Sequence, residues 1–259
     1  MFITVFLVCL AASTIGGICG IGGGVVIKPI LDALGIMSVS TVSFLSGLTV
    51  LSMSIVSVWK NRKGRELDPV RSIPLGIGAA IGGLSGKKLF ELIRSASSAD
   101  AVLGALQAGI LALLVLGTFL YVQNKAKIRP RNIKSPLAGM CIGLMLGVCS
   151  SFLGIGGGPM NLAVLYYFFS MDTKKAAVNS ILVILLSQST SFISTLISRS
   201  VPAFDPLILA SMVLAGILGG LVSAKLHKKL SVRTTDKLFS GLLIVIILIC
   251  IYNLLRFMA

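Results

Sequence analysis

The sequence predicts an all-α polytopic membrane protein built from two inverted-topology repeats, and three observations predict it. Hydrophobic residues make up 56% of the 259 residues and charged residues only 12%, a balance that soluble domains do not show. Apolar segments of about 20 residues, the length that crosses a bilayer, recur along the chain. The pentapeptide Gly-Ile-Gly-Gly-Gly occurs twice, at residues 20–24 and 154–158, inside segments with almost no charge.

Five apolar segments without a charged side chain are long enough to be membrane-spanning helices. A sixth candidate, 73–90, carries Lys87 and Lys88 near its end. Together the six segments supply three long helices after each glycine motif. The five uncharged segments are 39–59, 101–122, 176–197, 206–224 and 238–255.

The chain divides into two halves with the same plan. A hydroxyl-rich helix follows each glycine motif, and Ser46 and Ser180 stand at the same offset from their motifs. A second pair of similar segments follows, GAAIGGLSGKKL in one half and GILGGLVSAKLHKKL in the other. We therefore expect one transmembrane repeat at 1–122, a basic linker at 123–135 and a second repeat at 136–259. Internal symmetry of this kind is common in secondary transporters.

The basic residues indicate that the two halves are inverted. If each glycine motif turns its segment back, one side of the membrane holds 17 of the 23 Lys and Arg residues and the other holds six. If the glycine segments cross once instead, the split is 12 against 11. Cytoplasmic loops carry an excess of Lys and Arg, so we expect a cell-membrane protein with both termini outside. The loops on the basic side are 60–72, 123–135, 172–175 and 225–237.

The remaining polar composition excludes several functions. The net charge of +15 lies in short loops, where it sets topology and contacts anionic lipid headgroups, so no nucleic-acid partner is expected. The five cysteines lie in apolar segments and are expected to be packed free thiols. His227, the only histidine, lies among lysines and is expected to be exposed to solvent. No clustered His, Cys, Asp or Glu favours a metal, a cofactor or an enzyme.

The acidic residues leave the energy source of transport open. All eight lie in loops or near the ends of apolar segments, so the sequence offers no carboxylate in mid-membrane to carry a proton. The oligomeric state is open as well.

The glycine motifs predict a break in the helix at membrane depth. Glycine tolerates the backbone angles of a reversal, and irregular backbone at that depth requires protein or a water-filled cavity around it. Where a helix restarts, as at Pro159, its first N–H groups and positive dipole end face the break. Two inverted halves bring two such N-termini together, which predicts an anion site; close helix packing is the alternative role. Whether the segment is re-entrant or spans twice is open.

The motifs with their flanks also resemble a known family. GGICGIGGGVVIKPIL and GVCSSFLGIGGGPMNLAVL, each followed by a hydroxyl-rich helix, are similar to the paired signature of the TauE/SafE family, the sulfite exporter or toluenesulfonate uptake permease family. The resemblance covers both halves. It implies a secondary transporter of a small sulfur-containing anion: sulfite, a sulfonate, sulfoacetate or thiosulfate. The alternatives are an anion channel with the same paired helix N-termini and an intramembrane enzyme or assembly factor. For the enzyme, the spans offer no pair of nucleophile and base.

Hydroxyl groups recur at helical spacing on the helix after each motif. They can face a cavity between the halves, or they can pack closely and bond back to their own helix. These serines are Ser43, Ser46, Ser54 and Ser57 in the first half, and Ser180, Ser187, Ser191 and Ser194 in the second.

The candidate substrate-binding residues surround the two motifs. Lys28 can attract an anion, or it can extend to the membrane interface as lysines often do. Large amide side chains are costly against lipid, so Asn179 and Gln188 are expected to face the cavity between the halves. The predicted set is Gly20, Gly22, Gly23, Gly24, Lys28, Ser46, Gly154, Gly156, Gly157, Gly158, Asn161, Asn179, Ser180 and Gln188.

Overall fold

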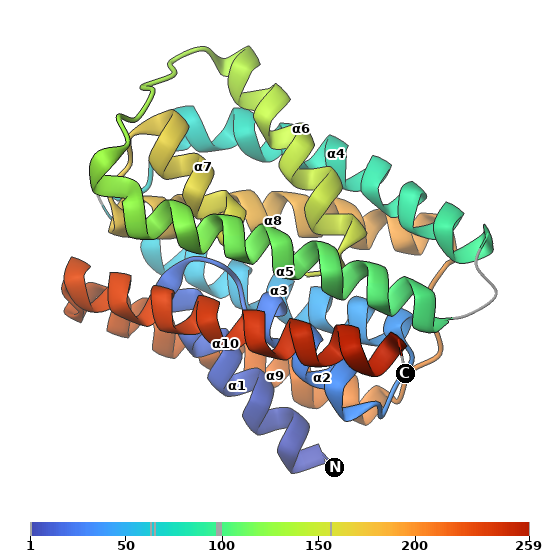
Figure 1. Ribbon diagram of the computed structural model, residues 1–259. Helices are drawn as coiled ribbons and strands as arrows, with labels where there is room; N and C mark the ends of the chain where they lie inside the picture. The colour runs from blue at the N-terminus through green and yellow to red at the C-terminus, as the bar shows by residue number, and fades with distance from the viewer. Residues whose placement is uncertain (1, 63, 65, 97–99, 156, 259) are drawn as a thin grey trace.

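The computed structural model describes residues 2–62, 64, 66–96, 100–155 and 157–258, and every regular element among them is a helix (Figure 1). A short 3₁₀ helix, Lys125–Lys127, follows the fifth α-helix. In chain order the α-helices are α1 Phe2–Cys19, α2 Gly24–Leu34, α3 Val39–Asn61, α4 Pro69–Ala96, α5 Asp100–Asn124, α6 Pro136–Phe152, α7 Pro159–Phe169, α8 Thr173–Ile197, α9 Pro206–Lys229 and α10 Val232–Met258.

Six of the described helices are long and apolar enough to cross a membrane: α1, α3, α5, α8, α9 and α10. The five uncharged segments predicted from the sequence fall on the last five of these, and α4 covers the sixth candidate. The prediction of an all-helical protein with three long helices after each glycine motif is therefore confirmed.

Each glycine motif separates a longer helix from a short one. The first motif lies between α1 and α2, and the second lies between α6 and α7. The short helices α2 and α7 have 11 residues each, which is roughly 16 Å at 1.5 Å per residue. That covers about half of a hydrocarbon core that is about 30 Å thick. The second arm of each broken segment is therefore too short for a full span.

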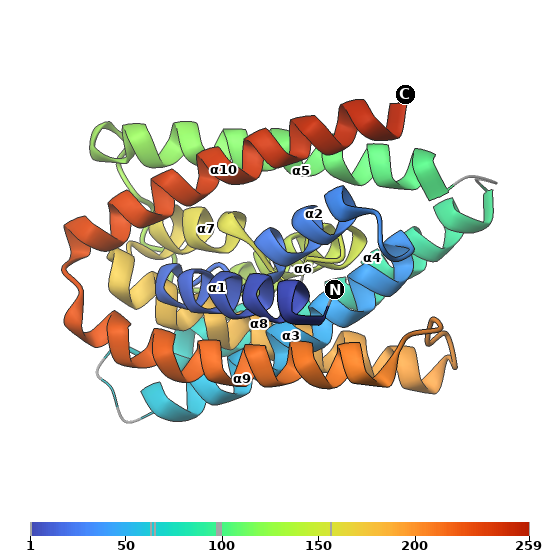
Figure 2. The same ribbon diagram turned by 90° about the horizontal axis from the view of Figure 1, so that it is seen from below.

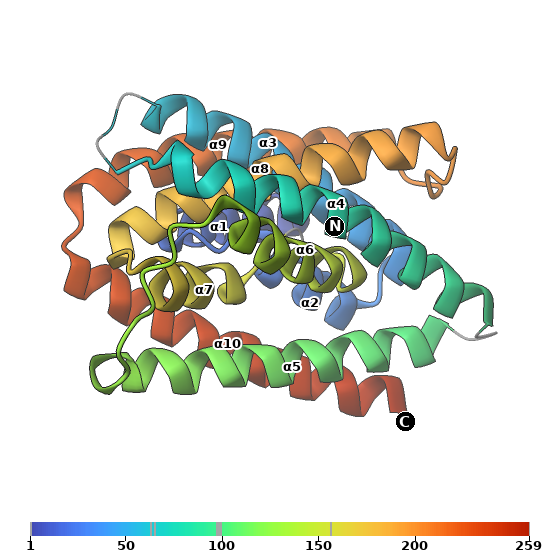
Figure 3. The same cartoon turned by 90° about the horizontal axis from the view of Figure 1, so that it is seen from above.

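The two halves of the chain are intertwined. The fourth helix of the first half, α4, packs against α6 and α8 of the second half, and α9 of the second half packs against α1 and α3 of the first. Figure 3 shows α4 running along α6. Glycines at four-residue spacing, Gly78, Gly82 and Gly86, let the two backbones approach, because a Cβ at any of them would overlap an α6 carbonyl group. Such small-residue stripes are typical of helix packing in membranes.

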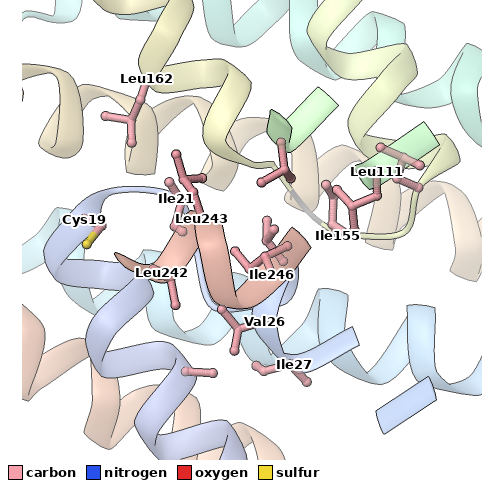
Figure 4. Close-up of a cluster of buried hydrophobic side chains, with 14 of the residues drawn as sticks. Cys19, Ile21, Val26, Ile27, Leu111, Ile155, Leu162, Leu242, Leu243 and Ile246 are labelled. Carbon is pink, nitrogen blue, oxygen red and sulfur yellow. The ribbon is translucent and has the colours of Figure 1, made fainter. Parts of the chain in front are cut away.

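The apolar core holds the two glycine turns in place. Helices α5 and α10 lie side by side on one face, over the short helices α2 and α7 (Figure 2). Ile21 and Ile155, the isoleucines of the two motifs, are buried beneath them with Leu111, Leu243 and Ile246 (Figure 4). Each motif thus combines glycines that turn the chain with one large side chain that anchors the turn.

The four loops rich in Lys and Arg gather at one end of the molecule, hereafter the basic end. Glu66 of loop 60–72 lies 3.3 Å from His227 of loop 225–237. Lys125 of the linker lies 2.8 Å from Asp236, which also belongs to loop 225–237, and 3.5 Å from Thr173 of loop 172–175. The structure confirms that these loops share one end.

Candidate functional site

The main cavity lies beside the second glycine turn and has a volume of about 180 Å³. Helices α3, α4, α6 and α8 surround it, and the connection between α8 and α9 lies at its mouth. That connection is at the end of the molecule opposite the basic end. The polar lining of the main cavity consists of Ser40, Ser43, Ser150, Ser151, Ser191, Thr195, Ser200, Gln188, Lys87 and Glu91, and Gly154 also lines the cavity.

Three hydroxyl groups of this lining have no partner within the protein. The Oγ atoms of Ser40, Ser43 and Ser151 are buried and make no hydrogen bond. An unpaired buried hydroxyl costs about 1–3 kcal/mol, and such groups are normally completed by water or a ligand. Water or a ligand in the cavity would complete these groups.

Lys87 brings a positive charge to the mouth of the cavity. Its Nζ donates hydrogen bonds to Ser198 Oγ at 3.2 Å and to Ser200 Oγ at 3.0 Å, and it lies 3.6 Å from Glu91 Oε1. Sequence reasoning treated Lys87 only as a weakness in an apolar segment. The position of Lys87 was itself the signal, because a charged residue inside an apolar segment is often functional.

The second glycine turn forms one wall of the main cavity. Gly154 has φ of 65°, a left-handed conformation that favours glycine. Ser46, on α3, donates a hydrogen bond to the Gly154 carbonyl at 3.2 Å, so this predicted residue does contact a glycine motif. Gly158 caps α7, whose first residue is Pro159, as the sequence predicts. Gly157 is buried in the same turn, and Gly156 lies outside the described residues.

The first glycine turn is packed against the second. A Cβ on Gly24 would overlap the Ile155 carbonyl, and a Cβ on Gly20 would overlap Ala177 of α8. Gly22 and Gly23 are buried in the same turn. Protein atoms therefore fill the space between the motifs, and Gly154 is the one described motif residue that lines the main cavity.

Lys28 faces a carboxylate. Its Nζ lies 2.7 Å from Asp32 Oδ2, one helical turn along α2, and the two side chains are only 3% and 7% exposed. The pair adjoins a second, much smaller cavity with Gln107 of α5 and Asn253 of α10. Lys28 is thus buried inside the protein, neither extended to the surface nor part of the main cavity lining.

Asn179 uses its whole amide group within the protein. Its Oδ1 accepts hydrogen bonds from the Asp68 amide at 2.8 Å and from Ser72 Oγ at 2.6 Å. Its Nδ2 donates to the carbonyls of Glu66 at 2.8 Å and Lys175 at 2.7 Å. Asn179 therefore fastens the α3–α4 loop to α8 at the basic end, away from the main cavity.

The other predicted polar residues divide between the cavity and the core. Gln188 lines the main cavity. Asn161 Oδ1 and Ser180 Oγ are buried without a hydrogen-bond partner, but neither residue is in that lining.

Two expectations from the sequence were wrong. His227 is buried, with a side chain only 2% exposed, because α1 covers this face of α9. Cys141 is exposed on the surface of α6, although Cys9, Cys19 and Cys250 are buried free thiols as expected.

Comparisons with known proteins find a transporter family and two similar relatives. The model of the family described as sulfite exporter TauE/SafE matches residues 5–249. The "Probable membrane transporter protein YunE" of Bacillus subtilis (strain 168) is 26% identical, with 95% of each chain covered. The "Probable membrane transporter protein YjnA" of the same organism is 25% identical, with 95% of this chain and 98% of the relative covered. No solved structure matches the chain. The matched family is one of transporters and not of enzymes, and this multi-pass chain belongs to the sulfite exporter TauE/SafE family.

Proposed function

We propose that the protein is a secondary transporter of small sulfur-containing anions, of the sulfite, sulfonate, sulfoacetate or thiosulfate type, which bind in the main cavity. The observation that carries the proposal is the meeting of unpaired buried hydroxyls with the Lys87 ammonium in one cavity. Hydroxyl donors and an ammonium are the groups that bind an oxyanion. The volume of about 180 Å³ admits such an anion with water, since one water needs about 10–15 Å³ on the same measure.

The proposal includes two inverted repeats. In support, Gly20 packs on Ala177 while Gly154 packs on Ser43, and a shift of 134 residues converts one pair into the other. Likewise, α1 packs on α9 as α6 packs on α4. With the basic end in the cytoplasm, the main cavity opens outside and both termini lie outside.

Inverted repeats supply a second site by exchange of roles between the halves. In the opposite conformation the first glycine turn would line a cavity at the basic end, as the second turn lines the main cavity here. Gly20, Gly22, Gly23, Gly24 and Ser180 would approach the anion in that state. The contact of Gly24 with Ile155 closes the path between the two ends, which supports a carrier over a channel.

Reconstituted protein separates the two mechanisms. Liposomes containing the protein are assayed for uptake of labelled sulfite, sulfate, thiosulfate, taurine and sulfoacetate. A carrier saturates and exchanges internal for external substrate, whereas a channel passes current far above carrier turnover. Absence of saturable, exchangeable uptake of every anion would refute the proposal.

Two serines on α3 locate the site. Ser43 lines the main cavity, whereas Ser54 is equally unpaired and buried on the same helix but lies outside the lining. A hydrogen bond to a charged group contributes about 1.5–3 kcal/mol, so Ser43→Ala is expected to raise the half-saturating concentration about tenfold or more. Ser54→Ala, the matched control, is expected to leave it unchanged. Equal behaviour of the two variants would place the anion elsewhere.

A further inference from the structure

The only histidine of the chain is buried at the basic end, where the transport site does not use it. His227 lies near the end of α9, and its side chain is 2% exposed, although its neighbours Lys225 and Lys228 are exposed. The ring contacts two segments that are distant in the sequence: Ile18 in the last turn of α1, and Glu66 in the α3–α4 loop.

Both ring nitrogens of His227 face acceptor atoms. Nδ1 lies 3.1 Å from the Ile18 carbonyl oxygen, and Nε2 lies 3.3 Å from Glu66 Oε2. A carbonyl oxygen only accepts, so Nδ1 carries a proton. A neutral ring has no second proton, and its Nε2 lone pair would then face an ionised carboxylate. The Nε2 contact is not aligned as a hydrogen bond, so its attraction comes from charge.

One proton more than a neutral histidine and an ionised glutamate hold turns this contact into an attraction. That proton resides on the ring or is shared with the carboxyl group. When this proton is lost, the attraction between the ring and the carboxyl group is replaced by repulsion between the Nε2 lone pair of His227 and Oε2 of Glu66.

The described cations that precede Glu66 most closely in the chain, Lys60 and Arg62, are directed elsewhere. Helices α1 and α3 pack against α9. The ionisable group of α1 nearest to Ile18 in sequence is the thiol of Cys19. Lys60 of α3 and Arg62, the residue after its end, lie over the ring of Trp59, 4.9 Å and 5.4 Å from its centroid. Among the described residues, Glu66 is thus the acidic group that faces the ring.

The protonated pair ties together the parts that close the basic end. Ile18 is two residues before Gly20 and the first glycine turn. The backbone of Glu66 is held by Asn179 of α8, whose Nδ2 donates to the Glu66 carbonyl. The Nδ1 hydrogen bond therefore fastens α9 to the end of α1 before the first glycine turn, and the additional proton fastens α9 to the loop that Asn179 secures.

We propose that His227 and Glu66 form a proton-binding site that locks the basic end of the protein shut. The proton comes from the compartment at that end, because the contacts of the ring lie there and the main cavity opens at the other. Histidine changes charge between about pH 5 and 8, so acid closes this end and alkali releases it. For transport, we expect slower turnover when that compartment is acidic, and this consequence rests on the proposed function. The lock itself does not depend on that function.

Alkylation of Cys19 measures the lock without any transport. Cys19 is buried beside Ile18, so opening of the basic end exposes it. The other four cysteines are replaced by alanine, and N-ethylmaleimide labelling of purified protein is followed at pH 6 and pH 8. Each rate is divided by the rate for Glu66→Gln at the same pH, which cancels the greater reactivity of thiols in alkali. The glutamine amide can donate to neutral Nε2, so this variant is expected to stay closed.

The labelling rate of the parent, divided by that of Glu66→Gln, is expected to rise with pH by up to about tenfold per pH unit for a single proton. Asp68→Asn is the matched control: it makes the same charge change in the same loop, but Asp68 lies beside Arg71 instead of the ring. This variant should respond to pH as the parent does. His227→Gln, which cannot take up the proton, should lose the response and serves as a second test.

A ratio that does not change with pH, or an unaltered response in His227→Gln, would overturn the lock. Loss of the response in Asp68→Asn would overturn the role of Glu66 in particular. A pH-dependent ratio in a protein that moves none of the tested anions would leave the lock standing and refute the transport function instead.

Discussion

Removal of the Lys28 charge is expected to destabilise the fold through Asp32. The two charges lie 2.7 Å apart with side chains 3% and 7% exposed, and the other carboxylate oxygen, Oδ1, has no hydrogen-bond partner. Breaking a buried ion pair costs about 3–5 kcal/mol, because the remaining charge stays buried without its partner. For a chain of this size, 1 kcal/mol corresponds to about 2–4 °C in melting temperature. Lys28→Met is therefore expected to melt about 6–20 °C below the parent.

A double variant tests whether the loss comes from the unpaired charge. Lys28→Met with Asp32→Asn leaves two uncharged side chains of similar volume, and it is expected to regain at least half of the lost melting temperature. The assay is thermal unfolding of the three purified proteins in one detergent at neutral pH, with size-exclusion chromatography as the readout of folded protein. A single variant within about 2 °C of the parent, or a double variant as unstable as the single one, would refute the reasoning.

Three further predictions address the cavity, the orientation and the basic end. Gly154→Val is expected to abolish uptake, since φ is 65° and a Cβ would lie 2.5 Å from Ser43 Oγ; normal uptake by membrane-inserted protein would contradict this. A membrane-impermeant maleimide applied to intact cells is expected to label Ser200→Cys and to spare Gly64→Cys; the reverse pattern would place the basic end outside. Asn179→Ala loses hydrogen bonds to four groups, at about 1 kcal/mol each, and should lower the melting temperature by several degrees; no change would show that those bonds do not hold the loop.

The helices and their glycine breaks follow from local sequence, which is why they could be predicted. Long uncharged segments have few alternatives to a helix in a membrane, and Pro159 suits only the first turn of a restarting helix. Gln188 of the main cavity was expected between the halves because a large amide is costly against lipid, and facing a cavity was one of the two roles left open for Ser43 and Ser191.

The parts that could not be predicted depend on contacts between distant segments. His227 stands among lysines in the sequence, and its burial results from α1, some 200 residues away, packing on α9. Asn179 was expected to face the cavity, but the α3–α4 loop occupies its whole amide group. The Lys28–Asp32 pair is different: its four-residue spacing is a signal of an ion pair on a helix, and it could have been found from the sequence.

Helix α4 packs against the second half and α9 packs against the first, and this has a consequence for biosynthesis. A chain emerging from the ribosome inserts α1 long before its partner α9 exists, and α4 presents its glycine stripe before α6 has been made. Early helices must therefore remain separate in the bilayer, or be held by the insertion machinery, until the second half arrives. Neither half can complete its own packing. Two fragments divided within the linker should become stable only when both are synthesised in the same cell.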